Sequence, residues 1–153
     1  EWCPAGELVR EAMASTDAAL SGFQWIVDVR EDDLVWCDAR LVTQALGNLV
    51  LNATQHVPPG SPVTIRIQTV PHEWRLEVRD RGPGLPPGRE AEVFRKFHRY
   101  GDHSRGTGLG LAICEVVARL HGGSITARNE AGAVFEMVFP MPAPAPMPEE
   151  WPT

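Results

Sequence analysis

Three alternating glycines precede an amphipathic segment in the stretch Arg105-Gly106-Thr107-Gly108-Leu109-Gly110-Leu111-Ala112-Ile113. Apolar residues recur there at helical spacing, at Leu109, Ala112, Ile113, Val116, Val117 and Leu120. Gly122-Gly123 then predicts the end of the helix. The three glycines would lie at the helix N-terminus, where unpaired N–H groups and the helix dipole bind phosphate. A flexible glycine hinge would give the same pattern, so this stretch alone does not decide between the two interpretations.

Composition and spacing exclude several other classes. The chain has no G-x-x-x-x-G-K-[ST] loop, and G-x-G-x-x-G would need glycine where Leu111 stands. Its 153 residues suit one domain, and 14 basic against 20 acidic residues argue against a nucleic-acid partner. The apolar runs are too short to be embedded in a membrane. Cys3, Cys37 and Cys114 lack C-x-x-C spacing and indicate reduced thiols in a cytoplasmic domain.

The periodicity predicts helices over residues 4–15, 38–55 and 91–100, and strands over residues 24–29, 63–68, 74–78, 124–128 and 134–139. Short connections between successive strands favour antiparallel pairing. We therefore predict an α+β fold, a two-layer α/β sandwich in which helices cover one face of a mixed, largely antiparallel sheet. Residues 1–140 should form one domain, and the Pro/Ala/Glu-rich residues 141–153 should be a disordered tail.

A stripe of uncharged amides marks one face of the second predicted helix, at Gln44, Asn48, Asn52 and Gln55. A solvated helix face normally carries Lys and Glu instead. An asparagine oxygen is a neutral ligand for Mg²⁺ when phosphates supply the remaining charge, as in a nucleotide site. The alternative is that these amides cap loops or tie the helix to the sheet.

Asp80 follows the strand 74–78 in phase with its apolar residues, so its carboxylate should point toward the buried face. A buried carboxylate needs a partner. Gly82 and Gly84 would leave an open pocket wall beside it, and the exocyclic amine of adenine is a suitable donor. The alternative is a turn aspartate that caps its own loop, as Asp-x-Gly sequences often do.

Together these motifs resemble the ATP-binding catalytic domain of sensor histidine kinases, whose Bergerat-type fold is shared with gyrase, the ninety-kilodalton heat-shock chaperone and MutL. The asparagine box is resembled by Asn48-Leu49-Val50-Leu51-Asn52-Ala53-Thr54-Gln55-His56, and the first glycine box by Asp80-Arg81-Gly82-Pro83-Gly84-Leu85. The phenylalanine box is resembled by Val93-Phe94-Arg95-Lys96-Phe97-His98-Arg99, and the second glycine box by Gly106-Thr107-Gly108-Leu109-Gly110-Leu111. The glycine boxes, with His121-Gly122-Gly123 after them, look most like the Kdp-type potassium-responsive sensor kinases.

The resemblance implies ATP and Mg²⁺ as cofactors and a role for each box residue. Asn48 and Asn52 would bind the metal, and Asn48 and Arg99 would act catalytically at the phosphates. Asp80 would accept the adenine amine. The nucleotide would also be contacted by Gln55, His56, Gly82, Gly84, Phe94, Gly106, Thr107, Gly108, Leu109 and Gly110. Residues 101–105 would form a short lid.

Two features depart from the family pattern. Gln55 stands where the asparagine box commonly has lysine, which removes a phosphate contact, and His56 stands where it often has tyrosine. No stretch resembles the phosphoacceptor histidine motif, which the family carries on a separate dimerisation domain. We therefore expect a fragment that follows this domain.

The implied activity is transfer of the γ-phosphoryl group of Mg-ATP to that histidine, with a response regulator as an indirect partner. The fragment would be cytoplasmic, and the full-length protein would be anchored in the inner membrane. Two other classes stay open: a nucleotide-binding sensor module without transferase activity, and an interaction domain that has lost nucleotide binding.

Overall fold

The computed structural model describes residues 1–16, 22–95 and 109–142 of the chain. Five strands form one sheet in the order β2-β4-β5-β7-β6. Their bounds are Gln24–Asp28 (β2), Pro62–Val70 (β4), Glu73–Arg79 (β5), Ala133–Pro140 (β7) and Ser124–Asn129 (β6). β2 runs parallel to β4, and the other neighbouring pairs are antiparallel. The predicted mixed, largely antiparallel sheet is confirmed.

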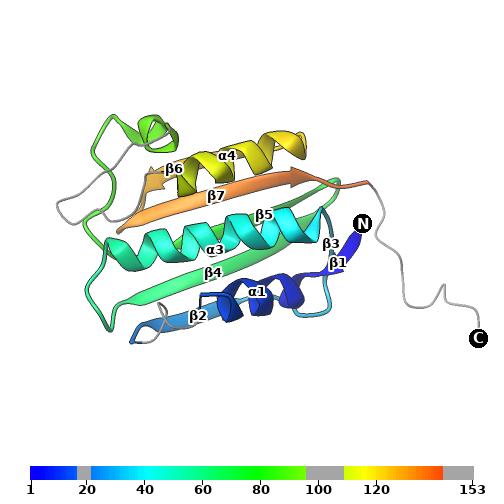
Figure 1. Cartoon of the computed structure of the whole chain (residues 1–153), viewed down its shortest axis with the longest axis horizontal. Coiled ribbons are helices and arrows are strands. Elements are labelled where there is room, and N and C mark those ends of the chain that lie inside the picture. The colour runs from blue at the N-terminus through cyan, green and yellow to red at the C-terminus, as the bar shows by residue number, and fades with distance from the viewer. Residues whose placement is uncertain (17–21, 96–108, 143–153) are drawn as a thin grey trace, which may run out of the picture.

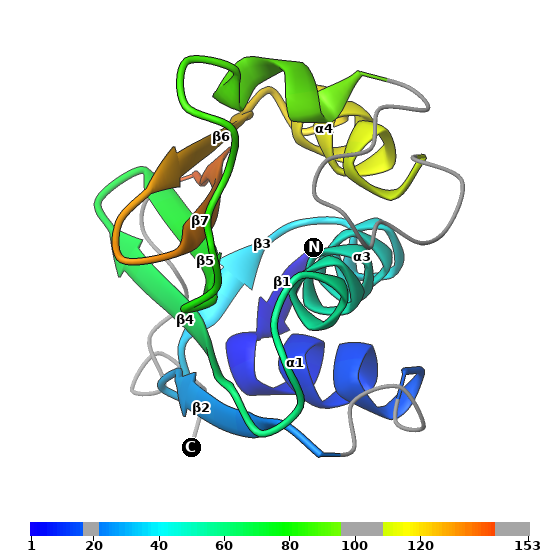
Figure 2. The same ribbon diagram turned by 90° about the vertical axis from the view of Figure 1, so that its left-hand side faces the viewer.

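Three helices lie on one face of this sheet, as Figures 1 and 2 show. They are α1 (Ala5–Ala14), α3 (Ala39–Gln55) and α4 (Gly110–Leu120). The space between the two layers is filled by fully buried apolar side chains, among which Trp74 and Phe139 stack with ring centroids 4.5 Å apart. The two-layer α/β sandwich predicted from the sequence is therefore confirmed.

A small antiparallel sheet of β1 (Trp2–Pro4) and β3 (Leu34–Trp36) was not predicted. Strands of three residues are too short for a period of two to be recognised. The rings of Trp2 and Trp36 meet edge to face with centroids 5.3 Å apart. Trp74 Nε1 donates a 3.1 Å hydrogen bond to the Trp36 carbonyl oxygen, and this bond joins the small sheet to β5.

The helix α3 begins and ends where the sequence predicts. The side chain of its N-cap residue, Asp38, accepts a 3.1 Å hydrogen bond from the N–H of Leu41. Its buried side consists of Val42, Ala45, Leu46, Gly47, Leu49, Val50 and Ala53. This orientation leaves Gln44 exposed, whereas the other three amides of the stripe, at positions 48, 52 and 55, are half-buried.

The helix α4 is rotated relative to the prediction. Val116 and Leu120, which we assigned to its apolar face, are 44% and 69% exposed. Ala112 and Val117 of the predicted face are buried as expected, together with Leu111, Cys114 and Ala118. The reason is that α4 packs on α3 as well as on the sheet, and the small Cys114 thiol reaches the Ala45 carbonyl oxygen at 3.3 Å. Burial raises the pKa of this thiol to about 12, which keeps it protonated.

The C-terminal end of α4 is closed by a glycine pair, as the sequence predicts. Gly122 adopts a left-handed conformation with φ of 72°. Its N–H donates to the Arg119 carbonyl oxygen and the Gly123 N–H donates to the Ala118 carbonyl oxygen, each at 2.9 Å. These are the two hydrogen bonds of a Schellman motif, which satisfies the last carbonyl groups of the helix.

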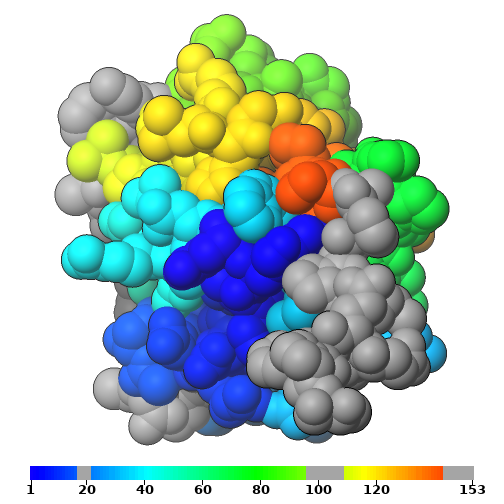
Figure 3. All heavy atoms as spheres, turned by 90° about the vertical axis from the view of Figure 1, so that its right-hand side faces the viewer, coloured from blue at the N-terminus to red at the C-terminus, as the bar shows by residue number. Residues whose placement is uncertain are grey.

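His121 connects the end of α4 to the start of α3. Its Nε2 accepts a 3.0 Å hydrogen bond from the N–H of Asp38, and its Nδ1 lies 2.7 Å from the Val117 carbonyl oxygen. Because the Asp38 amide is a donor, the proton of the imidazole is on Nδ1. Figure 3 shows this end of the molecule, where the start of α3 (cyan) lies between β1 (dark blue) and the end of α4 (yellow).

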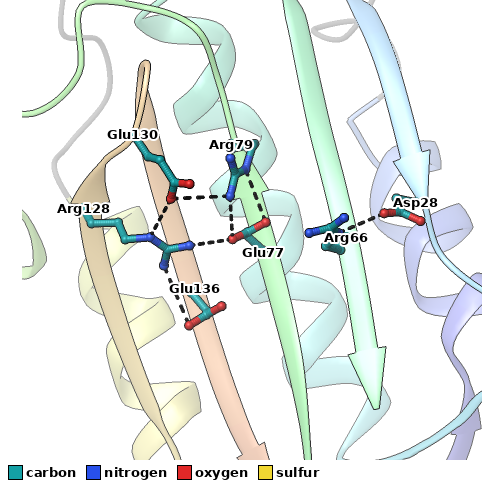
Figure 4. A network of polar contacts seen from close by, with 7 residues as sticks. All are labelled: Asp28, Arg66, Glu77, Arg79, Arg128, Glu130 and Glu136. Atoms are coloured by element: carbon teal, nitrogen blue, oxygen red, sulfur yellow. Dashed lines mark hydrogen bonds and ion pairs between the residues drawn. The ribbon is translucent and has the colours of Figure 1, made fainter. Parts of the chain in front are cut away.

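The face of the sheet away from the helices carries a network of charges (Figure 4). Glu77 of β5 lies directly opposite Glu136 of β7, which is a like-charge pair. Arg128 offsets the repulsion between these carboxylates, because its Nη2 donates to Glu77 at 2.8 Å and its Nη1 lies 3.8 Å from Glu136. Arg79 also pairs with Glu77, at 3.1 Å. Opposite charges therefore lie next to one another on this face.

The turn between β6 and β7 lies against the chain just beyond β5. The N–H of Asp80 donates a 3.0 Å hydrogen bond to the Ala133 carbonyl oxygen, which extends the pairing of β5 with β7. Gly132 has φ of 130°, and a Cβ at this position would overlap the Asp80 carbonyl oxygen. The contact between the two segments therefore requires glycine at position 132.

We predict that Gly132→Ala lowers the free energy of unfolding by more than ~3 kcal/mol, because the added methyl group meets backbone that cannot rotate away. Gly60 is a matched control, since it also has a positive φ, of 89°, but nothing lies within 4 Å of its Cβ position. Gly60→Ala should cost only ~1–2 kcal/mol of backbone strain. Urea unfolding followed by circular dichroism measures both variants, and equal losses would contradict the close contact at Gly132.

Candidate functional site

Asp80 comes directly after β5 and is only 3% exposed. It follows the buried Val78 in strand phase, so the predicted inward direction of its side chain is confirmed. Its Oδ1 accepts hydrogen bonds from the N–H groups of Gly82, at 2.9 Å, and of Ala133, at 3.0 Å. The carboxylate therefore caps its own turn, as the alternative interpretation predicts, and is also buried between two segments of the chain. Its role as acceptor of the adenine amine stays a prediction.

Gly82 and Gly84 are required by close contacts with neighbouring protein atoms. A Cβ on Gly82 would lie 2.7 Å from Val57 Cγ1 and 2.9 Å from the His56 carbonyl oxygen, just beyond α3. Gly84 has φ of 83°, and its Cβ position is 2.5 Å from Asn129 Oδ1. The prediction that these glycines leave an open wall is therefore wrong at both positions, because side chains or backbone of adjoining segments already fill the space.

Asn129, the last residue of β6, is a positioning residue that the sequence analysis missed. Its Oδ1 accepts a 2.7 Å hydrogen bond from the N–H of Leu85, and its Nδ2 donates a 3.1 Å bond to the Leu85 carbonyl oxygen. This pair of bonds holds the segment after Asp80 against the sheet. In the sequence, asparagine at a turn is common for local reasons, so nothing there indicated this role.

Asn48 lies between α3 and α4. Its Nδ2 lies 3.4 Å from the carbonyl oxygen of Gly110, the first residue of α4, which makes a long hydrogen bond. The contact brings the asparagine box next to the second glycine box, whose residue Leu109 is the N-cap of α4. This arrangement suits a nucleotide site. The contact also gives Asn48 a structural role that differs from the alternative considered above, because it ties α3 to another helix and not to the sheet.

The end of α3 lies close to Asp80. Asn52, Gln55 and His56 are half-buried there, and His56 is the C-cap residue of the helix. Burial lowers the pKa of His56, and the neighbouring Asp80 carboxylate opposes this shift. His56 therefore lies near a carboxylate and beside the Gly82 turn, in surroundings whose burial disfavours its charged form.

Phe94 is a core residue in this structure. It ends η1 (Glu90–Phe94), a 3-10 helix that replaces the first part of the expected α-helix 91–100. Its buried ring meets the ring of Phe135 edge to face, with centroids 6.2 Å apart. The nucleotide contact that the resemblance implies for Phe94 stays a prediction.

Several assigned residues lie outside the described part of the chain. They are Arg99, Gly106, Thr107 and Gly108, together with the lid at residues 101–105, the second half of the expected helix 91–100 and most of the tail. Their assigned roles stay predictions.

Residues 1–16, 22–95 and 109–142 contain no group of three or more His, Cys, Asp or Glu side chains that could hold a metal ion. The metal-binding roles that the resemblance implies for Asn48 and Asn52 stay predictions. No helix within them is long and apolar enough to cross a membrane.

The lowered pKa of His56 predicts a pH-dependent stability. The contribution of the neutral His56 to the free energy of unfolding is fully present above the unfolded-state pKa, about 6.5. It is lost as the pH falls through the lower folded-state pKa, because the unfolded chain takes up the proton first. The slope should be at most ~1.4 kcal/mol per pH unit.

His56→Gln should therefore flatten the dependence of the unfolding free energy on pH below about 6.5. His72→Asn is the control, because His72 is exposed in the β4–β5 turn with φ of 70°, a conformation that asparagine tolerates. Urea unfolding over this pH range measures both, and an unchanged slope in His56→Gln would refute the prediction.

Comparison with known proteins places this geometry in a family. The model of the histidine kinase-, DNA gyrase B- and HSP90-like ATPases matches residues 37–143, more than half of the chain. The probable sensor histidine kinase TcrY of Mycobacterium tuberculosis is 41% identical over 127 residues, which are 78% of this chain and 26% of that protein. The sensor protein KdpD of Escherichia coli is 36% identical over 144 residues, 92% of this chain and 16% of KdpD. The chain thus spans about a quarter or less of these relatives.

Solved structures agree with the sequence relatives. The mycobacterial sensor histidine kinase MprB superposes with a TM-score of 0.82 at 29% identity, covering 92% of this chain and 97% of that one. The catalytic domain of histidine kinase ThkA superposes with a TM-score of 0.81 at 28% identity, covering 92% and 95%. The chain therefore belongs to the histidine kinase-, DNA gyrase B- and HSP90-like ATPases, as a catalytic ATPase domain of the sensor histidine kinase type.

Proposed function

We propose that this chain binds Mg-ATP and donates the γ-phosphoryl group to a histidine on a separate dimerisation domain in two-component signalling. The observation that carries the proposal is the buried Asp80 carboxylate, held by two backbone N–H groups close to the end of α3. A carboxylate that is 3% exposed and fixed in this way is an acceptor of defined direction, next to a helix that carries the asparagine box.

The adenine base is the group that suits this acceptor. Its exocyclic amine is a donor, whereas guanine has a carbonyl oxygen at the corresponding position. A guanine would therefore place two acceptors face to face in poorly hydrated surroundings. Because a hydrogen bond to a charged group is stronger than one between neutral groups, Asp80 would select strongly for adenine.

The asparagine box fits Mg²⁺. Asn48 and Asn52 are one helical turn apart on α3, and both are half-buried. Their amide oxygens are hard, neutral ligands, which Mg²⁺ accepts when substrate phosphates supply the negative charge. These two residues would hold the ion, which neutralises phosphate charge when it is bound. The share of the protein in the reaction is to position the phosphates and exclude water.

A nucleotide-binding sensor module without transferase activity is the second candidate. Gln55 favours it, because a neutral amide replaces the lysine that the resembled box commonly has. Without this positive charge, the chain has one fewer group for neutralising the phosphates during transfer.

The partners and location belong to the same proposal. The dimerisation domain of the same kinase would supply the histidine, and a response regulator would receive the phosphoryl group from it. The domain, residues 1–140 followed by the tail 141–153, would act in the cytoplasm in a longer protein anchored in the inner membrane. A potassium-responsive input is supported by the resemblance of the glycine boxes and by KdpD relatives at 36% and 33% identity, whereas TcrY and MtrB are 41% identical.

Phosphotransfer can be tested by supplying the missing histidine. We expect the chain alone to leave all of its histidines unlabelled by γ-labelled ATP, and to label a purified dimerisation domain of a related kinase when Mg²⁺ is present. The label should be acid-labile and base-stable, as phosphohistidine is. Asn52→Ala should abolish transfer and weaken Mg-ATP binding more than metal-free ATP binding. ATP binding without any transfer would favour the sensor module.

Base selectivity tests the role of Asp80 separately. The chain should bind ADP at least about tenfold more tightly than GDP, since a mismatched buried hydrogen bond costs about 1–3 kcal/mol. Asp80→Ala should lose most of the ADP affinity, and Asp80→Asn should keep part of it if its amide oxygen faces the base. Calorimetric titration measures both after circular dichroism has confirmed folding. Equal affinity of the wild type for the two bases would reduce Asp80 to a turn residue.

A further inference from the structure

Two of the three cysteines of the chain lie beside each other in the small sheet. Cys3 is the middle residue of β1 and lies opposite Val35 of β3, and Cys37 directly follows β3. Alternate residues of a strand point to the same face, so Cys37 faces the same side as Val35 and therefore as Cys3. The two cysteines are thus diagonal neighbours across an antiparallel pair.

Hydrogen bonds bring the two thiols together. The carbonyl oxygen of Glu1 accepts a 3.0 Å bond from the N–H of Cys37, which continues the pairing of the two strands by one residue. The same oxygen lies 3.8 Å from Cys3 Sγ, which donates to it. The side chains of Cys3 and Cys37 also form a hydrogen bond with each other. Both thiols are buried, at 7% and 2% exposure, so the contact is held inside the fold.

The two thiols differ in acidity. Burial raises the pKa of both, because the interior of the protein disfavours a thiolate. The hydrogen bond with Cys37 opposes this rise at Cys3. At Cys37 the negative charge of a Cys3 thiolate and the hydrogen bond raise the pKa further. Cys3 is therefore the thiol that ionises first, and the thiolate is the form that reacts with an oxidant.

Cys37 is also the more firmly held of the pair. The Trp36 carbonyl oxygen before it accepts a 3.1 Å hydrogen bond from Trp74 Nε1. The Asp38 N–H after it donates a 3.0 Å bond to His121. β1, which carries the other thiol, has three residues and neighbours β3 alone among the described strands (Figure 1). A pair this short opens at lower cost than the five-stranded sheet, which gives a small oxidant access to the β1 thiol.

We propose that Cys3 and Cys37 form a reversible disulfide on reaction with a peroxide, such as hydrogen peroxide. The Cys3 thiolate attacks one peroxide oxygen, the O–O bond breaks, and the leaving hydroxide takes up the proton that Cys3 released, which gives a sulfenic acid and water. The Cys37 sulfur then attacks the Cys3 sulfur, so that an S–S bond forms as the S–O bond breaks. The second hydroxide takes the Cys37 proton and becomes water. The two thiols lose two electrons in total, and the peroxide gains them.

The bond needs only a small movement of β1. Disulfides join Cα atoms that are within about 7 Å of each other, and diagonal neighbours of an antiparallel pair are about 7–8 Å apart. A shift of β1 by about 1 Å toward Cys37 makes up this difference. The disulfide would close the loop from residue 3 to residue 37, which contains α1 and β2, and it would tie β1 to the start of α3.

Cys114 is a matched control within the chain. It is also buried, but its thiol lies 3.3 Å from the carbonyl oxygen of Ala45, inside α3. Ala45 is about 10 Å along this helix from Asp38, the residue that follows Cys37. The Cys114 thiol therefore lies about two helical turns away from the proposed bond.

The first test treats the whole chain with hydrogen peroxide, then unfolds it and alkylates the remaining thiols. The wild type should lose two of its three thiols to a link between Cys3 and Cys37, seen in a peptide map, and regain them with dithiothreitol. Cys114→Ala should form the same link at the same rate, and Cys3→Ala and Cys37→Ala should form none. A link to Cys114, a link between two chains, three unchanged thiols, or oxidation that dithiothreitol does not reverse would overturn the proposal.

Dimedone, which reacts with sulfenic acids, tests the order of the two steps. In Cys37→Ala the sulfenic acid at Cys3 meets no second thiol and should be labelled after peroxide treatment. In Cys3→Ala the thiol of Cys37 should stay unlabelled, since it is the more buried and the less acidic of the pair. Labelling of Cys37 alone would overturn the assignment of Cys3 as the attacking thiol.

Thermal unfolding of the wild type tests whether the bond belongs to the native fold, and it needs no variant. The oxidised chain should unfold at a Tm about 5 °C or more above that of the reduced chain, because the link restricts the unfolded state. Oxidised Cys114→Ala should show the same rise, and peroxide-treated Cys37→Ala should show none. An unchanged or lower Tm of the oxidised wild type would mean that the bond forms only by distorting the fold, and it would overturn the proposal.

Discussion

A buried carboxylate must be hydrogen-bonded, and Asp80 satisfies this requirement with N–H groups from two segments far apart in sequence. One donor, Gly82, belongs to the turn that follows β5, and the other, Ala133, begins β7. Both bonds end at Oδ1, so removing one donor would leave this oxygen with a single hydrogen bond in a place that water hardly reaches. The turn after β5 and the β6–β7 turn are therefore parts of one unit, and Gly132 is the residue that lets their backbones approach. A ligand that donates a hydrogen bond to Asp80 would therefore meet a carboxylate whose orientation is already fixed by the two N–H groups.

The helix α3 links this unit to the rest of the site. Residues just beyond its C-terminal end contact Gly82, its middle contacts Gly110 through Asn48, and its first turn is tied to His121 at the far end of α4. One rigid helix therefore sets the distance between both glycine boxes. A rigid element is better suited than a loop to hold phosphate and metal ligands in register, because positioning is most of what phosphoryl transfer requires.

The sequence predicted those features that repeat with a regular period. The core sides of α3, β4 and β5 follow from spacing, and so does the inward direction of Asp80. The rotation of α4 could not be predicted, because its own apolar and small side chains cover more than half of its circumference. Only the position of α3 decides which of these side chains are buried. Asn129 and Gly132 were missed for a related reason. Asn129 contacts Leu85 and Gly132 contacts Asp80, in each case across more than forty residues of sequence. In the sequence alone, asparagine and glycine at this place are already explained by the turn, so nothing indicates these distant contacts.

The two edges of the sheet are built on opposite principles, and this difference has a consequence for regulation. β6 is closed by ion pairs and supports the β6–β7 turn that holds Asp80, so a strand added at this edge would compete with groups that the candidate nucleotide site needs. β2 is separated from β5 by β4, and no residue of β2 contributes a hydrogen bond to Asp80 within the described chain. Any coupling between the β2 edge and the candidate nucleotide site would have to pass through the shared sheet or through α1 and its packing against α3.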